Sequence, residues 1–260
     1  MATENGSKIN KLMHIQPPGV VLTSNWLSRQ GYSPGLLRTY RNSHWLEAIG
    51  NGAMVRAGDS VDYAGAIYAL QQQLNLSIHP AAKTALALLG KSHYLGMGSN
   101  VVYLFGSTGE CLPSWFKNQH WNVEIQYFTS GILPAGMGLV EIEHKSFAVK
   151  ISSPARALME CLYLAPQKQE LTECFEIMQG LNNLNPANLQ ELLEHCTSVK
   201  VKRLFLYMAE KAGHAWFKHL IKSNIDLGKG NRSVVSNGVY VAGYKITVPK
   251  ELEADENPGL

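Results

Sequence analysis

The chain has 260 residues, of which 45% are hydrophobic and 17% are charged, and its formal net charge is +3. This composition is typical of a globular protein with room for two domains, and it excludes an intrinsically disordered chain, which would be poorer in apolar residues. No apolar run approaches the roughly 18 residues of a membrane span, and the polar N-terminus lacks the layout of a signal peptide, so we expect a cytoplasmic protein without a membrane partner.

The first predicted elements are short helices in a basic segment. Residues 1–57 carry a net charge of +4. Apolar periodicity predicts a helix from Ser7 that ends at residues 16–19, because two prolines and a glycine in that run interrupt a helix. A second short helix is predicted from Thr23, a suitable N-cap, to Gly31, a suitable stop.

A third helix and a hairpin complete this segment. Ser33 is a suitable N-cap, and the proline after it fits the first position of a helix. Asn51 and Gly52 lie between two short apolar runs, which is the strongest local signal for a β-hairpin. Three helices followed by a hairpin predict a winged helix-turn-helix domain over residues 1–58.

The third helix has two different faces when each residue turns it by about 100°. One face carries the side chains that we expect to pack, namely Leu36, Leu37, Tyr40 and His44. The opposite face carries Arg38, Arg41 and Asn42. In a major groove, Arg bonds guanine edges or phosphates and Asn pairs with adenine. The predicted contacts with double-stranded operator DNA are Ser33, Arg38, Thr39, Arg41, Asn42, Asn51 and Arg56. The alternative is a protein-docking module in which the two arginines are only solvated.

A larger domain is predicted over residues 59–250. Helical patterns extend from Asp59 towards residue 90, strand periodicity dominates residues 100–152, and helices return after Ser153 before a short β segment at 239–248. The domain is therefore a mixed α/β unit, and the whole chain belongs to the α+β class. Residues 251–260 read as a flexible acidic tail.

Four blocks of sequence resemble the AbiEi-type antitoxins, which regulate transcription in type IV toxin–antitoxin and abortive phage-infection systems. The blocks span most of the chain, at residues 31–41 (GYSPGLLRTYR), 45–52 (WLEAIGNG), 79–86 (HPAAKTAL) and 152–160 (SSPARALME). The resemblance implies a winged helix that represses the protein's own operon. It also implies a larger domain that counteracts a co-encoded nucleotidyltransferase toxin without a stable complex. The oligomeric state stays open, a monomer in solution included.

A second basic zone, residues 199–232, carries a net charge of +6. Val201, Leu204, Phe205 and Met208 predict the core stripe of a helix, beside which basic residues and a tyrosine gather. Such a mixture suits a nucleic-acid backbone and an unpaired base, although an ordinary solvated helix face looks similar. The loop 228–233 is glycine-rich but lacks the full order of a P-loop. The possible second nucleic-acid surface consists of Lys200, Lys202, Arg203, Tyr207, Lys218, Lys222, Lys229 and Arg232.

Enzymatic interpretations find little support in the sequence. Gly106 and Ser107 resemble the start of a nucleotidyltransferase motif, but the paired carboxylates that hold its metal ions do not follow. Glu141, Glu143 and Lys145 suggest a metal-dependent nuclease, yet alternation along the strand explains the two glutamates as an exposed face. The four cysteines lie far apart, unlike zinc or redox motifs, and Cys161, Cys174 and Cys196 read as buried thiols. We expect no enzyme activity, no metal and no cofactor.

Overall fold

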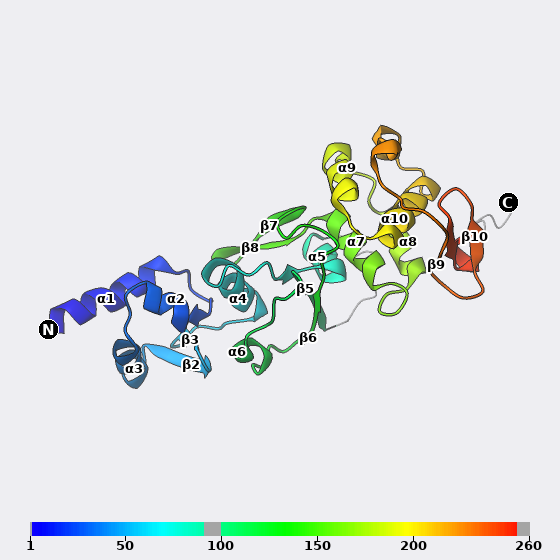
Figure 1. Ribbon diagram of the computed structural model, residues 1–260. Coiled ribbons are helices and arrows are strands. Elements are labelled where there is room, and N and C mark those ends of the chain that lie inside the picture. The colour runs from blue at the N-terminus through cyan, green and yellow to red at the C-terminus, as the bar shows by residue number, and fades with distance from the viewer. Residues whose placement is uncertain (1, 91–99, 254–260) are drawn as a thin grey trace.

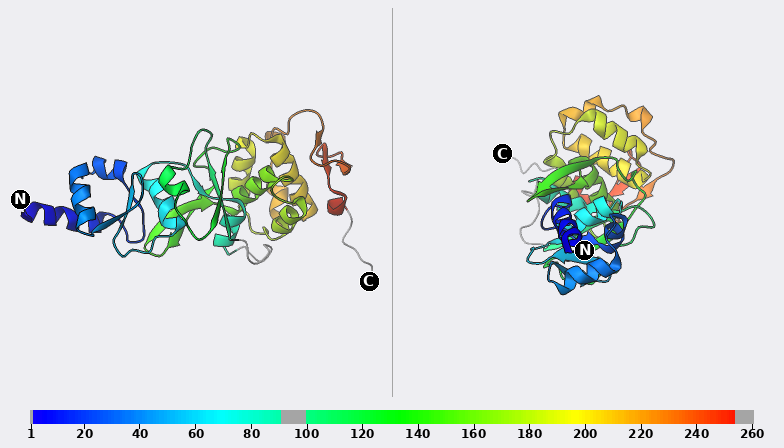
Figure 2. Two further views of the ribbon diagram at one scale, coloured as in Figure 1. Left: turned by 90° about the horizontal axis from the view of Figure 1, so that it is seen from below. Right: turned by 90° about the vertical axis from the view of Figure 1, so that its left-hand side faces the viewer.

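The computed structural model describes residues 2–90 and 100–253. The molecule is elongated, with the N-terminal domain at one end and a small C-terminal sheet at the other (Figure 1; Figure 2). Within the described ranges, no helix combines the length and the apolar character that crossing a bilayer requires.

The N-terminal domain has the element order of a winged helix, which confirms the predicted architecture. Its three strands form an antiparallel sheet in the order β1-β3-β2, and the helices precede the hairpin in the chain (Figure 1). The elements are α1 (Ala2–Ile15), β1 (Leu22–Thr23), α2 (Ser24–Arg29), α3 (Pro34–Asn42), β2 (Leu46–Gly50) and β3 (Ala53–Arg56).

Local sequence signals explain most of these boundaries. α1 ends at Ile15, just before the two prolines. Ser33 Oγ accepts a hydrogen bond from the Leu36 amide at 3.3 Å, as expected of an N-cap. Thr23 stands at the cap position of α2, but its hydroxyl makes no capping bond. The prediction that His44 packs with the α3 core face is wrong, because the helix has already ended and His44 is exposed with φ 55°.

The middle of the molecule contains two small sheets and the helices that cover them. β4 pairs antiparallel with β5, β5 pairs parallel with β6, and β7 forms a separate hairpin with β8. α5 packs against β5 and β8, and α4 packs against β8. The elements are α4 (Tyr63–Tyr68), the π-helix η1 (Ala69–Gln73), β4 (His79–Pro80), α5 (Ala82–Leu88), β5 (Val101–Gly106), α6 (Ser114–Lys117), β6 (Glu124–Thr129), β7 (Leu139–His144) and β8 (Phe147–Ser152).

Helices and a three-stranded sheet make up the C-terminal part. Ser153 and Pro154 begin α7 as predicted, with Ser153 Oγ accepting from the Arg156 amide. The elements are α7 (Pro154–Leu164), α8 (Leu171–Gln179), α9 (Pro186–His195), α10 (Val199–Lys211), the 3-10 helices η3 (Ala215–His219) and η4 (Lys222–Asn224), β9 (Arg232–Ser233), β10 (Val239–Val241), β11 (Ile246–Val248) and α11 (Lys250–Glu253).

The predicted flexible tail is wrong for its first three residues. Residues 251–253 belong to α11, which packs against α8. Leu252 is buried, and its carbonyl accepts a hydrogen bond from the Tyr207 hydroxyl. Burial of the Leu252 side chain, together with this hydrogen bond, holds α11 against the helices of the C-terminal part. Residues 254–260 lie outside the described residues.

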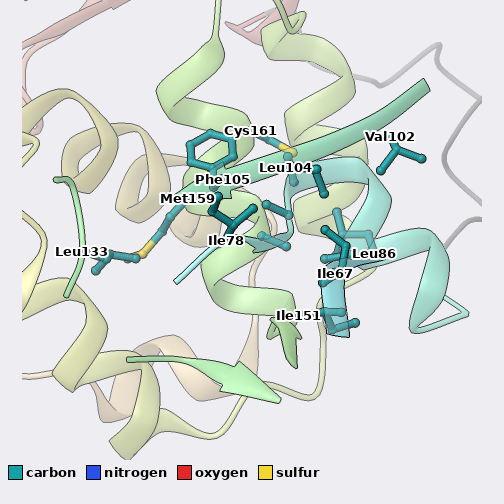
Figure 3. Close-up of a cluster of buried hydrophobic side chains, with 14 of the residues drawn as sticks. Ile67, Ile78, Leu86, Val102, Leu104, Phe105, Leu133, Ile151, Met159 and Cys161 are labelled. Carbon is teal, nitrogen blue, oxygen red and sulfur yellow. The ribbon is translucent and has the colours of Figure 1, made fainter. Parts of the chain in front are cut away.

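The apolar core of the larger domain lies between the central sheet and helices α5 and α7 (Figure 3). Leu104 and Phe105 of β5 face Leu86 of α5 and Met159 of α7, and all four side chains are buried. Cys161, Cys174 and Cys196 are buried free thiols, as expected, and burial raises the pKa of each. These thiols therefore pack as small apolar groups and stay protonated near neutral pH.

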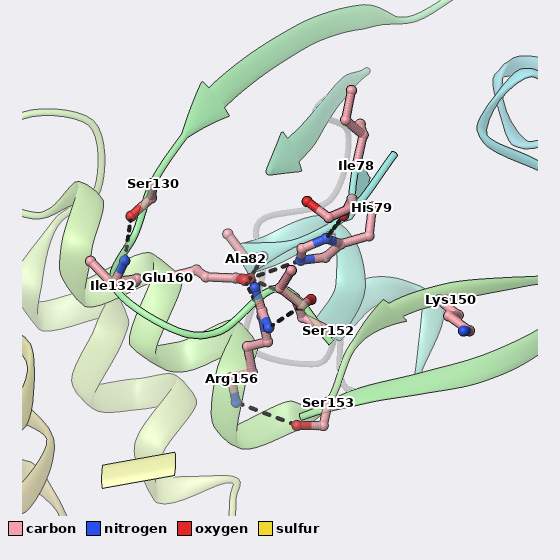
Figure 4. A network of polar contacts seen from close by, with 12 residues as sticks. Ile78, His79, Ala82, Ser130, Ile132, Lys150, Ser152, Ser153, Arg156 and Glu160 are labelled. Atoms are coloured by element: carbon pink, nitrogen blue, oxygen red, sulfur yellow. Dashed lines mark hydrogen bonds and ion pairs between the residues drawn. The ribbon is translucent and has the colours of Figure 1, made fainter. Parts of the chain in front are cut away.

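A polar network crosses this core (Figure 4). The Glu160 side chain is 1% exposed and accepts four hydrogen bonds, from His79 Nε2, Arg156 Nε, the Ala82 amide and the Ser152 hydroxyl. Burial opposes ionisation of Glu160, but the hydrogen bonds and charges of His79 and Arg156 outweigh it and lower its pKa. The carboxylate therefore joins β4, α5, β8 and α7.

His79 completes this network through the other side of its ring. Its Nδ1 lies 2.6 Å from the Ser77 carbonyl, while Nε2 faces the Glu160 carboxylate. Both neighbours are hydrogen-bond acceptors, so each ring nitrogen is placed to donate. His79 is thus a bridging residue of the core.

Replacing Glu160 by Gln should lower the free energy of unfolding at pH 7 by about 3–5 kcal/mol, because the buried Arg156 guanidinium loses its counter-charge and the network around it loses a carboxylate acceptor. The folded-state pKa of Glu160 is lowered, so its contribution is complete above the unfolded pKa of about 4.3 and is lost as the pH falls through the folded value. Urea unfolding between pH 7 and pH 3 measures both effects. Glu143→Gln, an exposed change, is the control; equal pH slopes in E160Q and the wild type would contradict this account.

Candidate DNA interface

Helix α3 presents a polar face to solvent and an apolar face to the domain. Leu37 and Tyr40 are 5% and 4% exposed, and α3 packs against β2 on this side. Arg38 and Arg41 are exposed, and neither side chain forms an ion pair or hydrogen bond with any described residue. The predicted separation of faces is therefore present for these four residues, and the two guanidinium groups are available to a partner.

The other predicted contacts on α3 are exposed as well. Ser33 and Asn42 stand at the two ends of the helix, and Thr39 lies between them. The Thr39 hydroxyl donates to the Gly35 carbonyl at 3.2 Å, and its oxygen can still accept a hydrogen bond from a partner. Together with the two arginines they give the helix hydrogen-bonding groups suited to base edges and phosphates.

The hairpin forms the wing at the position that the sequence predicted. Gly50 pairs with Ala53, so Asn51 and Gly52 are the two turn residues, and Asn51 is exposed at the tip. Gly52 has φ 84° and Gly50 has φ 138°, which only glycine adopts readily. A bulge between Ala48 and Gly50 accompanies this turn.

Arg56 does not belong to the exposed surface, so this prediction is corrected. Its Nη2 donates to the Met13 carbonyl at 2.9 Å and to the Gln16 carbonyl. Burial lowers the pKa of the guanidinium, which the charge of Asp59 partly opposes. Arg56 satisfies the carbonyls at the C-terminal end of α1 and holds that helix against β3.

The predicted second nucleic-acid surface is not a single exposed surface. Lys202, Arg203 and Tyr207 are 4%, 1% and 5% exposed, because α10 is covered on almost every side by other helices and the C-terminal sheet. Lys200 is half-buried, and its amine donates to the carbonyls of Tyr163 and Ala165 at 2.9 and 2.6 Å. These four residues stabilise the fold and are unavailable to a polyanion.

Arg203 of α10 binds the loops that flank the C-terminal sheet. Its guanidinium donates to the carbonyls of Leu227, Gly228, Gly230 and Lys245 at 2.8 to 3.2 Å. The glycine-rich loop therefore turns its carbonyl oxygens towards Arg203, and the Gly228 amide donates to Asp226 at 2.8 Å. These carbonyls and the Gly228 amide are thus engaged within the protein and hold the loop in place.

The remaining members of the second group are exposed but scattered. Lys218, Lys229 and Arg232 lie on η3, the 228–230 loop and β9. Lys222 pairs with Glu210 at 3.1 Å and lies 4.2 Å from the centre of the Phe217 ring. The charge of Lys222 is thus partly neutralised, and these four residues do not line one helix face.

The suggested nuclease residues do not converge. Glu141 and Glu143 are exposed on β7, as the alternation predicted. Lys145 lies in the β7–β8 turn with φ 56°, and its amine contacts Asp62 Oδ2 at 2.9 Å, so it is already paired with another carboxylate. Over residues 2–90 and 100–253, no group of three or more His, Cys, Asp or Glu side chains is arranged to hold a metal ion.

The junction between the winged helix and the rest of the molecule was not foreseen from the sequence. Gln73 is 1% exposed; its Oε1 accepts from the Thr23 amide at 2.8 Å and its Nε2 donates to the Val21 carbonyl at 2.7 Å. Arg29 donates to the Gln73 carbonyl at 2.5 Å. The side-chain amide therefore acts as an extra strand partner for β1. No local pattern distinguishes this glutamine from its neighbours Gln71 and Gln72.

A second contact at the junction involves the β7–β8 turn. Asp62 Oδ1 caps α4 by accepting from the Ala64 and Gly65 amides, while Oδ2 lies 2.9 Å from His144 Nε2 and from Lys145 Nζ. Burial opposes ionisation of Asp62, but the hydrogen bonds from Lys145 and His144 outweigh it and lower its pKa. The Ser146 hydroxyl donates to the Pro18 carbonyl nearby. The hairpin turn thus holds both α4 and the linker after α1.

Comparison with known families identifies the relatives of this fold. A family model described as "Transcriptional regulator, AbiEi antitoxin N-terminal domain" matches residues 5–97, and one described as "Transcriptional regulator, AbiEi antitoxin, Type IV TA system" matches residues 99–249. The chain belongs to the AbiEi antitoxin family. This family comprises transcriptional regulators and antitoxins, so the resemblance drawn from four sequence blocks is confirmed.

Structural comparison gives the same overall fold. The crystal structure of the RV2827C protein from Mycobacterium tuberculosis matches with a TM-score of 0.55 and 15% sequence identity, over 94% of this chain and 90% of that chain. At this identity the likeness concerns the fold alone. No curated protein matches the sequence. The two AbiEi family models meet near residue 98. The domain boundary expected between residues 58 and 59 stays a prediction.

Replacing Arg203 by Met should lower the free energy of unfolding by at least about 3 kcal/mol, because four inward carbonyls lose their donors. Chemical denaturation followed by far-UV circular dichroism measures this loss. Lys229→Met changes an exposed residue of the same loop and should stay within about 0.5 kcal/mol of the wild type. A variant R203M as stable as K229M would show that the carbonyl contacts add nothing.

Proposed function

We propose that this AbiEi-family protein binds the operator of its own operon through its winged helix and represses its own transcription. The observation that carries the proposal is the exposed polar face of α3, where Arg38 and Arg41 have no carboxylate partner among the described residues. The net charge of +4 over residues 1–57 supports attraction to a polyanion.

The proposed contacts follow the chemistry of the side chains. Arg38 and Arg41 bond guanine edges or phosphates in the major groove, and Asn42 pairs with adenine. Ser33 and Thr39 contact phosphates at the edge of the groove, and Asn51 at the wing tip reaches the neighbouring backbone. Arg56 is no longer part of this set, because its donors already serve the end of α1.

We further propose that the larger domain counteracts a nucleotidyltransferase toxin encoded beside this protein, without a stable complex. Membership of a type IV toxin–antitoxin family supports an antitoxin role. The buried state of Lys202, Arg203 and Tyr207 removes the α10 face as the surface responsible. The antitoxin role is therefore proposed for the domain as a whole and assigned to no particular residue.

Replacing Arg38 and Arg41 together by Ala should weaken binding to the DNA that precedes the protein's own gene by at least about thirtyfold. The reason is the loss of two contacts worth about 1–3 kcal/mol each. Both side chains are exposed, so the fold should be kept. Fluorescence anisotropy with a labelled duplex measures the dissociation constant.

Lys168→Ala, an exposed change on the far part of the molecule, should leave this affinity unchanged. Wild-type affinity should also fall steeply between 50 and 200 mM salt, because bound phosphates release counterions. Unchanged binding by the double variant would contradict the assignment of α3. Absence of salt-dependent DNA binding by the wild type would favour a protein-docking module instead.

The double variant should still neutralise the toxin, because the altered side chains belong to the winged helix and the antitoxin role is proposed for the other domain. Co-expression of the toxin with either form, followed by growth, measures this, with an empty vector as control. A tagged toxin should retain neither form after washing. If the variant, at equal protein level, fails to restore growth, the antitoxin role does not belong to the larger domain alone. If the tagged toxin retains the protein in stoichiometric amount, the two form a stable complex, which contradicts the proposal.

A further inference from the structure

The wing does not stand free of the larger domain, because the end of β2 next to the wing turn packs against helix α6 (Figure 1). Trp115 Cα and Cβ both lie 3.1 Å from the place that a Cβ at position 50 would occupy, so only glycine allows this approach without displacement. Trp115 itself is 5% exposed. The wing and α6 are therefore in direct contact.

Helix α6 is held firmly in this position by aromatic packing. The Phe116 ring lies 5.8 Å from the Trp115 ring and 5.3 Å from the Trp121 ring, measured between centroids. Trp121 Nε1 donates to the Phe116 carbonyl at 2.9 Å. Because the residues on both sides are buried, the loop between them has a fixed place beside the wing.

This loop carries an exposed positive charge. Lys117 is the single Lys, Arg, Asp or Glu of residues 111–123. Its side chain is exposed, as are those of Asn118 and His120, and it forms no ion pair with any other residue that the structure describes. An ammonium without a carboxylate partner among the described residues therefore lies two positions after Trp115, the residue that touches the wing.

We propose that the loop of residues 117–120 is a second part of the DNA interface, with Lys117 contacting a phosphate of the backbone beyond the wing. The proposal rests on the proposed function, since it extends the surface that α3 and Asn51 begin. We infer that a duplex touching the wing tip also comes within reach of α6, because Gly50, next to the wing turn, lies too close to Trp115 for any larger residue. A phosphate contact positions the duplex and carries no sequence information.

Replacing Lys117 by Gln tests this proposal in the full-length protein. Affinity for the duplex that precedes the protein's own gene should fall by about three- to tenfold at 100 mM salt. The slope of log K against log salt should decrease in magnitude by about 0.9, the value for one phosphate contact. The same loss is expected on a mixed-sequence duplex, and Lys117→Arg should restore most of the affinity. Lys168→Gln is the matched exposed control.

Each outcome bears on the proposal. One outcome is that K117Q keeps the wild-type affinity and salt slope, while the Arg38 and Arg41 double variant loses binding. This would overturn the second contact and leave the proposed function intact. A loss confined to the protein's own duplex would overturn the phosphate contact in favour of base recognition. Undiminished binding by the double variant, or no DNA binding by the wild type, would overturn the proposed function and this extension with it.

Discussion

The placement of the winged helix depends on the buried side-chain amide of Gln73. It supplies the donor and the acceptor that the backbone of β1 needs at Val21 and Thr23. A buried amide with both functions satisfied is a directional contact, unlike apolar packing, and it holds the backbone at Val21 and Thr23 against η1. The contacts of Asp62 with His144 and Lys145 add a second link between the winged helix and the rest of the molecule. The positions of α3 and of the wing therefore depend on residues outside the winged helix as well as on those within it.

The sequence predicted best where the signals were local. Ser33 and Ser153, each followed by a proline, mark the starts of α3 and α7, because a cap and a fixed φ act within one turn of helix. Asn51 and Gly52 mark the wing turn, because the conformation of a two-residue turn depends on those two residues. The two faces of α3 followed from the helical period for Leu37, Tyr40, Arg38 and Arg41. The prediction for His44 was wrong because the helical period was extended past Asn42, where the helix ends.

The predictions that failed depended on what lies around an element. Period alone shows where α10 begins and which residues share a face, but it does not show that the C-terminal sheet covers the basic face. Arg203 is buried because carbonyls from two distant segments converge on it, and that convergence has no signature in the sequence. Arg56 was misplaced for the same reason, since its acceptors come from α1. Basic residues in a helical pattern therefore need the tertiary structure before they can be assigned to a surface.

Backbone hydrogen exchange, compared between the free protein and its complex with the DNA that precedes its own gene, shows which surface binds the duplex. We expect slowed exchange in residues 33–44, around the wing turn at residues 50–53 and in the segment 114–121. Exchange in residues 199–232 should stay unchanged. Slowed exchange confined to residues 199–232, with none in α3 or the wing, would refute DNA binding through the winged helix.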